Sequence, residues 1–272
     1  MREITIGQYY FADSPIHRLD PRVKVAMTFF YMVSLFFQKS VLTIAFSIFA
    51  LGAVIHLSQV PFKFMVKGLK PIAFIILLSI VVNMLFVPGE VLIKVWVIQI
   101  TKEGIVQAVF LTMRLALLIM GASVLTLTTT PNQLTDGLEK MFGFLNRVKV
   151  PVHEIAMMMS IALRFIPILT EETDKIMKAQ MARGADFESG NLIQKAKSLI
   201  PVLVPLFVAA IRRANDLAMA MEAKCYNGSE GRTKMKPLIY QKEDKLGYIC
   251  IAGYVAVLIT LTVLSGKIGI SF

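Results

Sequence analysis

Long apolar runs recur along this chain and restrict its fold more than any other feature. A helix needs roughly 20 apolar residues to cross a bilayer, and five runs reach that length with their flanks. These five runs are Val25–Phe37, Val41–Leu57, Pro71–Val87, Gly104–Thr128 and Lys245–Ser265. Only 17% of the residues are charged, against roughly a quarter in soluble domains. The sequence therefore predicts an all-α integral membrane protein with about five transmembrane helices.

The segments between the runs carry recognisable start and stop signals. Asp20-Pro21 and Thr130-Pro131 are typical of helix starts, since the polar side chain caps the first turn and proline fits its first position. Pro61–Lys70 mixes lysines with aromatic residues and is typical of a helix in the membrane interface. Val91 to Val97 alternates and predicts a short strand or hairpin. Arg114, inside the fourth run, is expected to lie near the outer end of that helix or to face other helices rather than lipid; a role in transport is the less favoured alternative.

The distribution of basic residues predicts the orientation. Loops that stay in the cytoplasm collect Lys and Arg, which also accounts for the net charge of +11 without a nucleic-acid partner. The basic segments are the N-terminal segment, Pro61–Lys70 and the stretch between the fourth and fifth runs. We therefore predict a membrane domain at 1–128, a cytoplasmic domain at 129–243 and a last transmembrane helix at 244–272, with the N-terminus inside.

Two long helical patterns between Val148 and Gly228 each end at a small-basic-small tripeptide. The first has an apolar face that includes Met158 and Met159, and the second starts after Asn191 and contains Pro201 and Pro205, which must bend or break it. The tripeptides are Ala182-Arg183-Gly184 and Ala223-Lys224-Cys225. Gly184 predicts a helix stop, since glycine favours the left-handed position after a helix end. Small flanking residues allow close approach to a partner's groove, where the cation can donate to carboxylates or to helix C-termini. We predict that both tips face a partner on one side of the membrane.

These motifs, taken in order, resemble those of the transmembrane T component of energy-coupling factor transporters, the CbiQ/EcfT family. The resemblance rests on His17-Arg18-Leu19-Asp20-Pro21-Arg22-Val23-Lys24, Thr129-Thr130-Pro131, Leu163-Arg164-Phe165-Ile166-Pro167, Met181-Ala182-Arg183-Gly184-Ala185 and Glu222-Ala223-Lys224-Cys225-Tyr226. It implies a subunit of a prokaryotic plasma membrane that couples two ABC-type ATPases to a small membrane S component, which binds a vitamin or another micronutrient. The cytoplasmic domain at 129–243 would then be the coupling domain. ATP and Mg would be bound by the ATPases, and substrate selectivity would reside in the S component.

The resemblance also implies residue roles. In the family an X-Arg-X tripeptide contacts each ATPase, which gives Arg183 that role directly, whereas Lys224 departs from the pattern. Lysine keeps the charge but loses the bidentate fork, so we expect the two ATPases to differ. The coupling helices are further expected to pack, with each other or with the S component, through Met158, Met159, Phe165, Pro167, Pro201 and Pro205.

Two other classes of function fit the sequence less well. A self-sufficient secondary transporter is the main alternative, but the runs contain no Asp or Glu and no repeat is evident. An enzyme would need a nucleophile with a base, paired carboxylates or a metal cluster, and none is recognisable. The G-x-x-x-x-G-K-[ST] phosphate loop is missing from the sequence, so ATP hydrolysis would belong to another chain. We expect no cofactor or metal in this chain.

Overall fold

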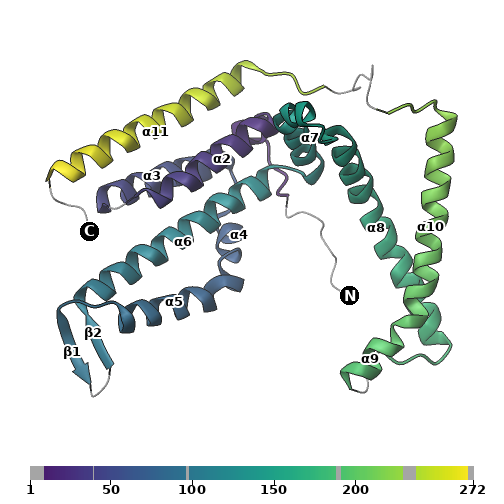
Figure 1. Cartoon of the computed structure of the whole chain (residues 1–272), viewed down its shortest axis with the longest axis horizontal. Helices are drawn as coiled ribbons and strands as arrows, with labels where there is room; N and C mark the ends of the chain where they lie inside the picture. The colour runs from purple at the N-terminus through teal and green to yellow at the C-terminus, as the bar shows by residue number, and fades with distance from the viewer. Residues whose placement is uncertain (1–8, 39, 96–97, 188–190, 229–236, 269–272) are drawn as a thin grey trace. The chain divides into compact units, whose positions relative to one another are not determined.

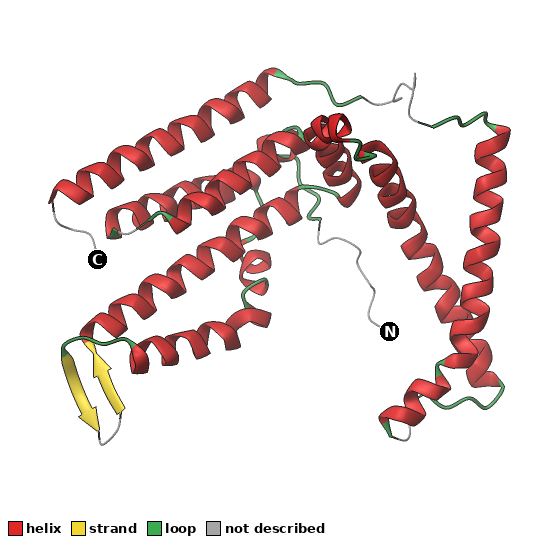
Figure 2. Cartoon of the chain, viewed as in Figure 1, coloured by secondary structure: helices red, strands yellow, loops and turns green. Residues whose placement is uncertain are grey.

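The computed structural model describes residues 9–38, 40–95, 98–187, 191–228 and 237–268, and these residues form two compact units (Figure 1). The first unit comprises Met1–Gly137 and Leu238–Phe272, and the second comprises Leu138–Pro237. The predicted all-α class is confirmed, with one short β-hairpin in addition (Figure 2). The second unit covers fewer residues than the domain predicted at 129–243; Gly137 lies close to Pro21, and the Leu238 carbonyl accepts from Arg22.

The first unit begins with helices whose starts are set by local capping. After α1 (Pro15–Arg18), the Asp20 side chain accepts from the Arg22 N–H at 2.9 Å, and α2 (Pro21–Phe36) starts at the predicted proline. A turn at the end of α2 leads into α3 (Val41–Ser58). Lys39 in this turn lies outside the described residues. Asp-Pro thus acts here as the sequence predicts, as a cap followed by a first-turn proline.

The next part of the first unit is a helical hairpin with strands at its tip. The segment predicted to lie in the interface forms α4 (Phe62–Lys67) and a 3₁₀ turn, η1 (Lys70–Ile72), which leads into α5 (Ala73–Phe86). The strands β1 (Val91–Val95) and β2 (Ile98–Thr101) pair antiparallel, which confirms the predicted hairpin, although Val97 lies outside the described residues. Strand β2 runs directly into α6 (Lys102–Thr128).

Helices α2, α3 and α6 pack around a shared core in the first unit, and α11 (Lys242–Ile268) packs against α2 and α3. Leu35 of α2 and Leu117 of α6 are among the buried side chains of this core, at 1% and 6% exposed. Arg114 faces the neighbouring helices, as predicted, because its Nη2 donates to the Gln38 carbonyl oxygen at 2.8 Å. The Tyr254 hydroxyl of α11 lies 2.9 Å from the Ser47 hydroxyl of α3.

The second unit consists mainly of two long helices. It begins within α7 (Pro131–Phe142) and continues through a 3₁₀ segment, η2 (Gly143–Val148), into α8 (Val152–Ala182), α9 (Leu192–Ser198) and α10 (Ile200–Ala223). The break between α9 and α10 falls just before Pro201, as predicted for a proline. Pro205 lies inside α10 and Pro167 inside α8, and both helices continue past them.

Six helical stretches of the described residues are long and apolar enough to cross a membrane by length and composition. They are Val41–Ser58, Phe62–Phe86, Lys102–Thr128, Val152–Ala182, Ile193–Ala223 and Lys242–Ser265. Four correspond to predicted transmembrane runs, and two are the stretches predicted to form the coupling domain. The 16-residue α2, predicted as the first crossing, is shorter than these. Apolar length alone therefore does not separate α8 and α10 from transmembrane helices.

Candidate functional site: two basic helix ends

The first basic tripeptide closes α8 with a complete hydrogen-bonded cap. Arg183 is the C-cap residue, and Gly184 follows with a φ of 90°. The Gly184 N–H donates to the Met181 carbonyl and the Ala185 N–H donates to the Gln180 carbonyl, both at 3.0 Å. This pair of bonds is the Schellman motif, which satisfies carbonyls that a helix end leaves open and favours glycine at the left-handed position. The predicted helix stop at Gly184 is confirmed.

The second basic tripeptide closes α10 with the same cap. Lys224 is the C-cap residue, and the Cys225 N–H donates to the Glu222 carbonyl at 2.8 Å. The Tyr226 N–H donates to the Met221 carbonyl at 3.1 Å. Cys225 occupies the left-handed position with a φ of 54°. The two tripeptides therefore place their basic residue at the same point of the same backbone motif.

The two helix ends differ in two residues, the one that carries the charge and the one that follows it. A side chain in the left-handed region costs on the order of 1 kcal/mol, which glycine avoids, so Cys225 is strained where Gly184 is not. Lysine offers a point charge, whereas arginine offers a planar fork of donors. All six residues are exposed: Ala182, Arg183, Gly184, Ala223, Lys224 and Cys225. Both helix ends are thus accessible to a partner, but they offer it different hydrogen-bond donors.

Helices α8 and α10 run antiparallel within the second unit (Figure 1). Arg213 Nη2 donates to Glu172 Oε2 at 3.1 Å, and Gln180 Nε2 donates to the Pro201 carbonyl at 3.3 Å. The ion pair lies about three turns, or about 16 Å, before the basic end of each helix. Because the helices run in opposite directions, the two basic ends lie at opposite ends of the pair. A pair lying along a membrane surface would still present both ends to one side.

The residues predicted to pack along the coupling helices are spread over both of them. Met158 and Met159 of α8 are 57% and 50% exposed. Phe165 is half-buried, while Pro167, Pro201 and Pro205 are exposed. Of this set, Pro201 joins the two helices, through the bond from Gln180. The structure therefore leaves most of these residues on open faces rather than gathering them into one pocket.

The open face of α10 extends well beyond the predicted residues. Its large exposed apolar side chains are Ile200, Leu203, Val204, Phe207, Val208, Ile211 and Met219. Phe207 is 66% exposed. Contiguous apolar surface of this kind marks a face that contacts another protein or lipid. None of these residues belongs to the candidate site that the sequence predicts.

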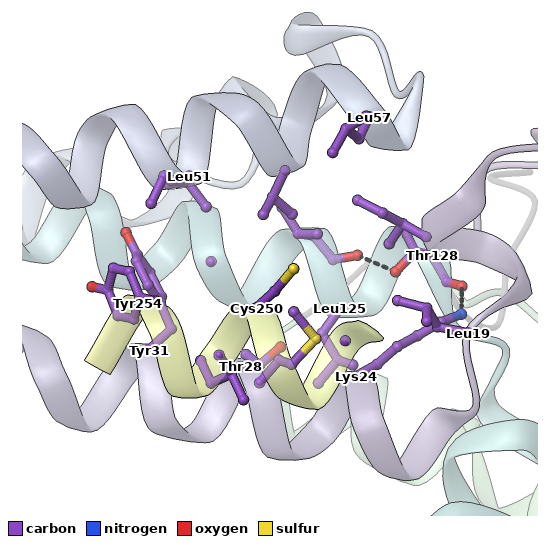
Figure 3. Close-up of a pocket in the computed structure, with 18 of the residues that line it drawn as sticks. Leu19, Lys24, Thr28, Tyr31, Leu51, Leu57, Leu125, Thr128, Cys250 and Tyr254 are labelled. Atoms are coloured by element: carbon purple, nitrogen blue, oxygen red, sulfur yellow. Dashed lines mark hydrogen bonds between the residues drawn. The ribbon is translucent and has the colours of Figure 1, made fainter. Parts of the chain in front are cut away.

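A separate apolar cavity of about 440 Å³ lies within the first unit (Figure 3). Its walls come from α1, α2, α3, α6 and α11, with Leu51, Leu125 and Cys250 among the lining residues. Lys24 at its wall is 5% exposed and donates to the carbonyls of Thr128 at 2.9 Å and His17 at 3.0 Å. Over the part of the chain that the structure describes, no cluster of His, Cys, Asp and Glu could hold a metal ion.

Comparisons with known proteins agree with these features. Residues 12–235 match the family model described as CbiQ, cobalt transport protein. A protein of Thermosediminibacter oceani is 54% identical over 249 residues, covering 92% of this chain and 94% of the relative. Relatives from Clostridium kluyveri and Bacillus subtilis are 49% and 46% identical, over 98% and 90% of this chain and 100% and 92% of their own length. Each of the three is named energy-coupling factor transporter transmembrane protein EcfT.

Proposed function

The chain belongs to the CbiQ/EcfT family of energy-coupling factor transporter transmembrane proteins, and from this premise we propose that it links two ABC-type ATPases to a small substrate-binding S component. The protein is a multi-pass membrane protein. In the proposal, the ATPases bind ATP and Mg and this chain has no catalytic role. Their movement passes through the second unit to the S component, which binds a vitamin or another micronutrient for import.

The observation that carries the proposal is that α8 and α10 end in the same backbone cap, and that the two caps lie at opposite ends of the antiparallel pair. Arg183 and Lys224 are exposed and occupy equivalent positions. Because the helices are antiparallel, one groove of ordinary size would not reach both cations. The arrangement instead suits two grooves on two subunits, each receiving a helix end whose last carbonyls are already satisfied.

The inequality of the two ends supports an ATPase heterodimer. Arg183 can form a bidentate pair with a carboxylate, whereas Lys224 can only make single bonds. The left-handed position is Gly184 in one cap and Cys225 in the other, so the surface beside each cation also differs. Two identical grooves would favour two identical tips. We therefore assign Arg183 and Lys224 to different ATPase chains.

The apolar faces of α8 and α10 are the surfaces that would meet the S component. Met158 and Met159 can adapt to more than one packing arrangement, since thioether side chains are flexible and polarisable. A face that must slide or repack during transport favours such flexible side chains over side chains that fit only one packing arrangement. The charge distribution favours an N-terminus and a second unit in the cytoplasm, where the ATPases lie.

The test is co-purification of the tagged chain with its two ATPases and an S component from native membranes. Arg183→Glu should lower the recovered ATPase by more than tenfold, because it replaces an attraction by a repulsion worth more than about 1.4 kcal/mol. Arg147→Glu is the matched control, since Arg147 is an exposed arginine of η2 outside both tripeptides. Equal recovery of the ATPases with both variants would contradict the site assignment.

A second experiment separates the proposal from a self-sufficient secondary transporter. The chain alone, reconstituted in liposomes, should show no substrate uptake driven by an ion gradient. Uptake should require both ATPases, the S component and ATP. Gradient-driven uptake by the chain alone would overturn the proposed function.

A further inference from the structure

We propose that Asp20-Pro21-Arg22, at the start of α2, is a shared anchor that holds both chain connections to the second unit. On the proposed function, it is the point at which movement of the coupling helices reaches the membrane helices. Every contact described below lies within the first unit, between α2 and the residues at which the chain leaves for the second unit and returns from it.

The outgoing connection, in α7, packs against Pro21. Gly137 is buried and is the last residue of the first unit before the chain enters the second. A Cβ atom at Gly137 would lie 2.9 Å from the Pro21 Cβ and 3.4 Å from the Arg22 backbone nitrogen. Only glycine allows α7 to lie this close to the first turn of α2. Lys24 holds the end of α6, just before α7, through its bond to the Thr128 carbonyl (Figure 3).

The returning connection rests on Arg22. Leu238 is the first residue of the first unit after the second, and its carbonyl accepts from Arg22 Nη2 at 3.4 Å. The Arg22 guanidinium carbon lies 3.8 Å from the centroid of the Tyr240 ring, within the range of a cation–π contact. A few residues later, the Asp244 carboxylate accepts from the Asp20 N–H and from the Gln241 N–H, both at 2.7 Å. The chain is therefore fixed to α2 as soon as it returns.

The anchor is held by a buried ion pair. Asp20 accepts from Arg22 Nε at 3.0 Å and Nη2 at 2.7 Å, and the two side chains are only 4% and 13% exposed. Burial alone would raise the pKa of Asp20, but the hydrogen bonds from the Arg22 side chain and backbone hold that pKa below its usual value. The carboxylate therefore stays charged, and Arg22 keeps one geometry in which it can reach both Leu238 and Tyr240.

The arrangement goes beyond ordinary capping because adjacent residues serve opposite directions of the chain. Pro21 packs against the outgoing helix α7, and Arg22 binds the segment that returns at Leu238. Both connections to the second unit therefore contact the same turn of α2. A pull on either connection acts on the start of α2. A helix cap alone needs only Asp20, and a merely stabilising contact would not have to involve both connections.

The test uses the assembled complex in proteoliposomes and measures ATP hydrolysis and substrate uptake on the same sample. Tyr240→Leu removes the ring under Arg22 but keeps an apolar side chain, and Arg22→Lys keeps the charge but removes the fork. Both should lower uptake per ATP hydrolysed by about tenfold, within the usual range of coupling between distant sites. ATPase recovery and ATP hydrolysis should remain near those of the unmodified complex.

Arg18→Lys is the matched control. Arg18 makes an equally bidentate pair with Asp13, at 2.9 and 2.8 Å, but both side chains are well exposed and the pair touches neither connection. Its uptake per ATP should equal that of the unmodified complex. Unchanged coupling in Tyr240→Leu and Arg22→Lys would overturn the anchor, as would a loss of uptake matched by an equal loss of bound ATPase. If the unmodified chain retained no ATPase, the proposed function itself would fail instead.

Discussion

Helices α2, α3 and α6 of the first unit bury side chains against one another, with α11 against α2 and α3, whereas α8 and α10 of the second unit leave most of theirs open. The buried residues of the first unit include Leu35 and Leu117. In α8 and α10, by contrast, the buried residues are Val152, Ala156 and Val202. Helices α2, α3 and α6 thus share a core within the first unit, whereas α8 and α10 leave broad apolar faces uncovered. On the proposed function, the uncovered faces of α8 and α10 are where a partner would pack.

The contrast between the two units can be tested by truncating one apolar side chain in each, and the change in the free energy of unfolding is the largest effect that we expect. Leu35→Ala should lower the free energy of unfolding by about 2 kcal/mol, the lower end for buried leucine, because detergent shields the side chain from water in the unfolded state as well. Phe207→Ala should change it by less than about 0.5 kcal/mol, since the ring is 66% exposed. Denaturant titration of the purified chain in one detergent measures both.

Phe207→Ala has a further expected consequence in the complex. If the face of α10 is covered by a partner, this variant should retain less S component during purification than the unmodified chain. Comparable losses of stability in Leu35→Ala and Phe207→Ala would show instead that the second unit packs as tightly as the first, and would remove the contrast between them.

The two caps offer a second comparison, within the second unit. Gly184→Ala should destabilise the end of α8 by about 1 kcal/mol, because alanine must adopt a φ of 90°. Nothing lies within 4 Å of a Cβ added there, so the cost is conformational and not steric. Cys225→Gly should instead stabilise the end of α10, by less than Gly184→Ala destabilises the end of α8. Glycine relieves the backbone strain at this position but also gives the unfolded chain more conformational freedom. Hydrogen exchange of the Ala185 and Tyr226 amides reports each cap; equal signs would contradict the strain assigned to Cys225.

These caps also mark the limit of what the sequence could predict. Starts at Asp20-Pro21 and Thr130-Pro131 and the stop at Gly184 depend on bonds within a few residues, so local patterns predicted them correctly. The left-handed Cys225 has no local signal, because cysteine rarely occupies that region. The bond from the Asp20 N–H to Asp244 joins residues 224 positions apart, and no periodicity encodes such a pairing. The antiparallel course of α8 and α10 likewise follows from tertiary packing.

A smaller effect is expected for the ion pair between α8 and α10. Glu172→Gln removes the charge that Arg213 faces, yet the two side chains are 29% and 37% exposed, so water screens their attraction. The free energy of unfolding should fall by at most about 0.5 kcal/mol. Thermal unfolding at low and high salt is the measurement. A larger, salt-insensitive loss would mean that this pair is shielded from water and that the second unit is more self-sufficient than its open faces suggest.

The smallest expected effect is a pH dependence at the edge of the first unit. His17 lies 2.7 Å from the Ser14 hydroxyl through Nδ1 and 3.0 Å from the Tyr10 carbonyl through Nε2. Burial lowers its pKa below the usual 6.5 and nearby Lys24 lowers it further, while the bond to Tyr10 and the charge of Asp13 act in the opposite direction.

Because the folded state favours neutral His17, its contribution to stability is complete above pH 6.5 and is lost as the pH falls through the lower folded pKa. Acidification from pH 7.5 to 5 should therefore speed hydrogen exchange in residues 9–19, after correction for the intrinsic rates. His17→Asn cannot titrate and should show no such change, whereas the Ala185 and Tyr226 amides of the second unit serve as an internal reference. An equal acceleration in His17→Asn would assign the pH dependence to another group.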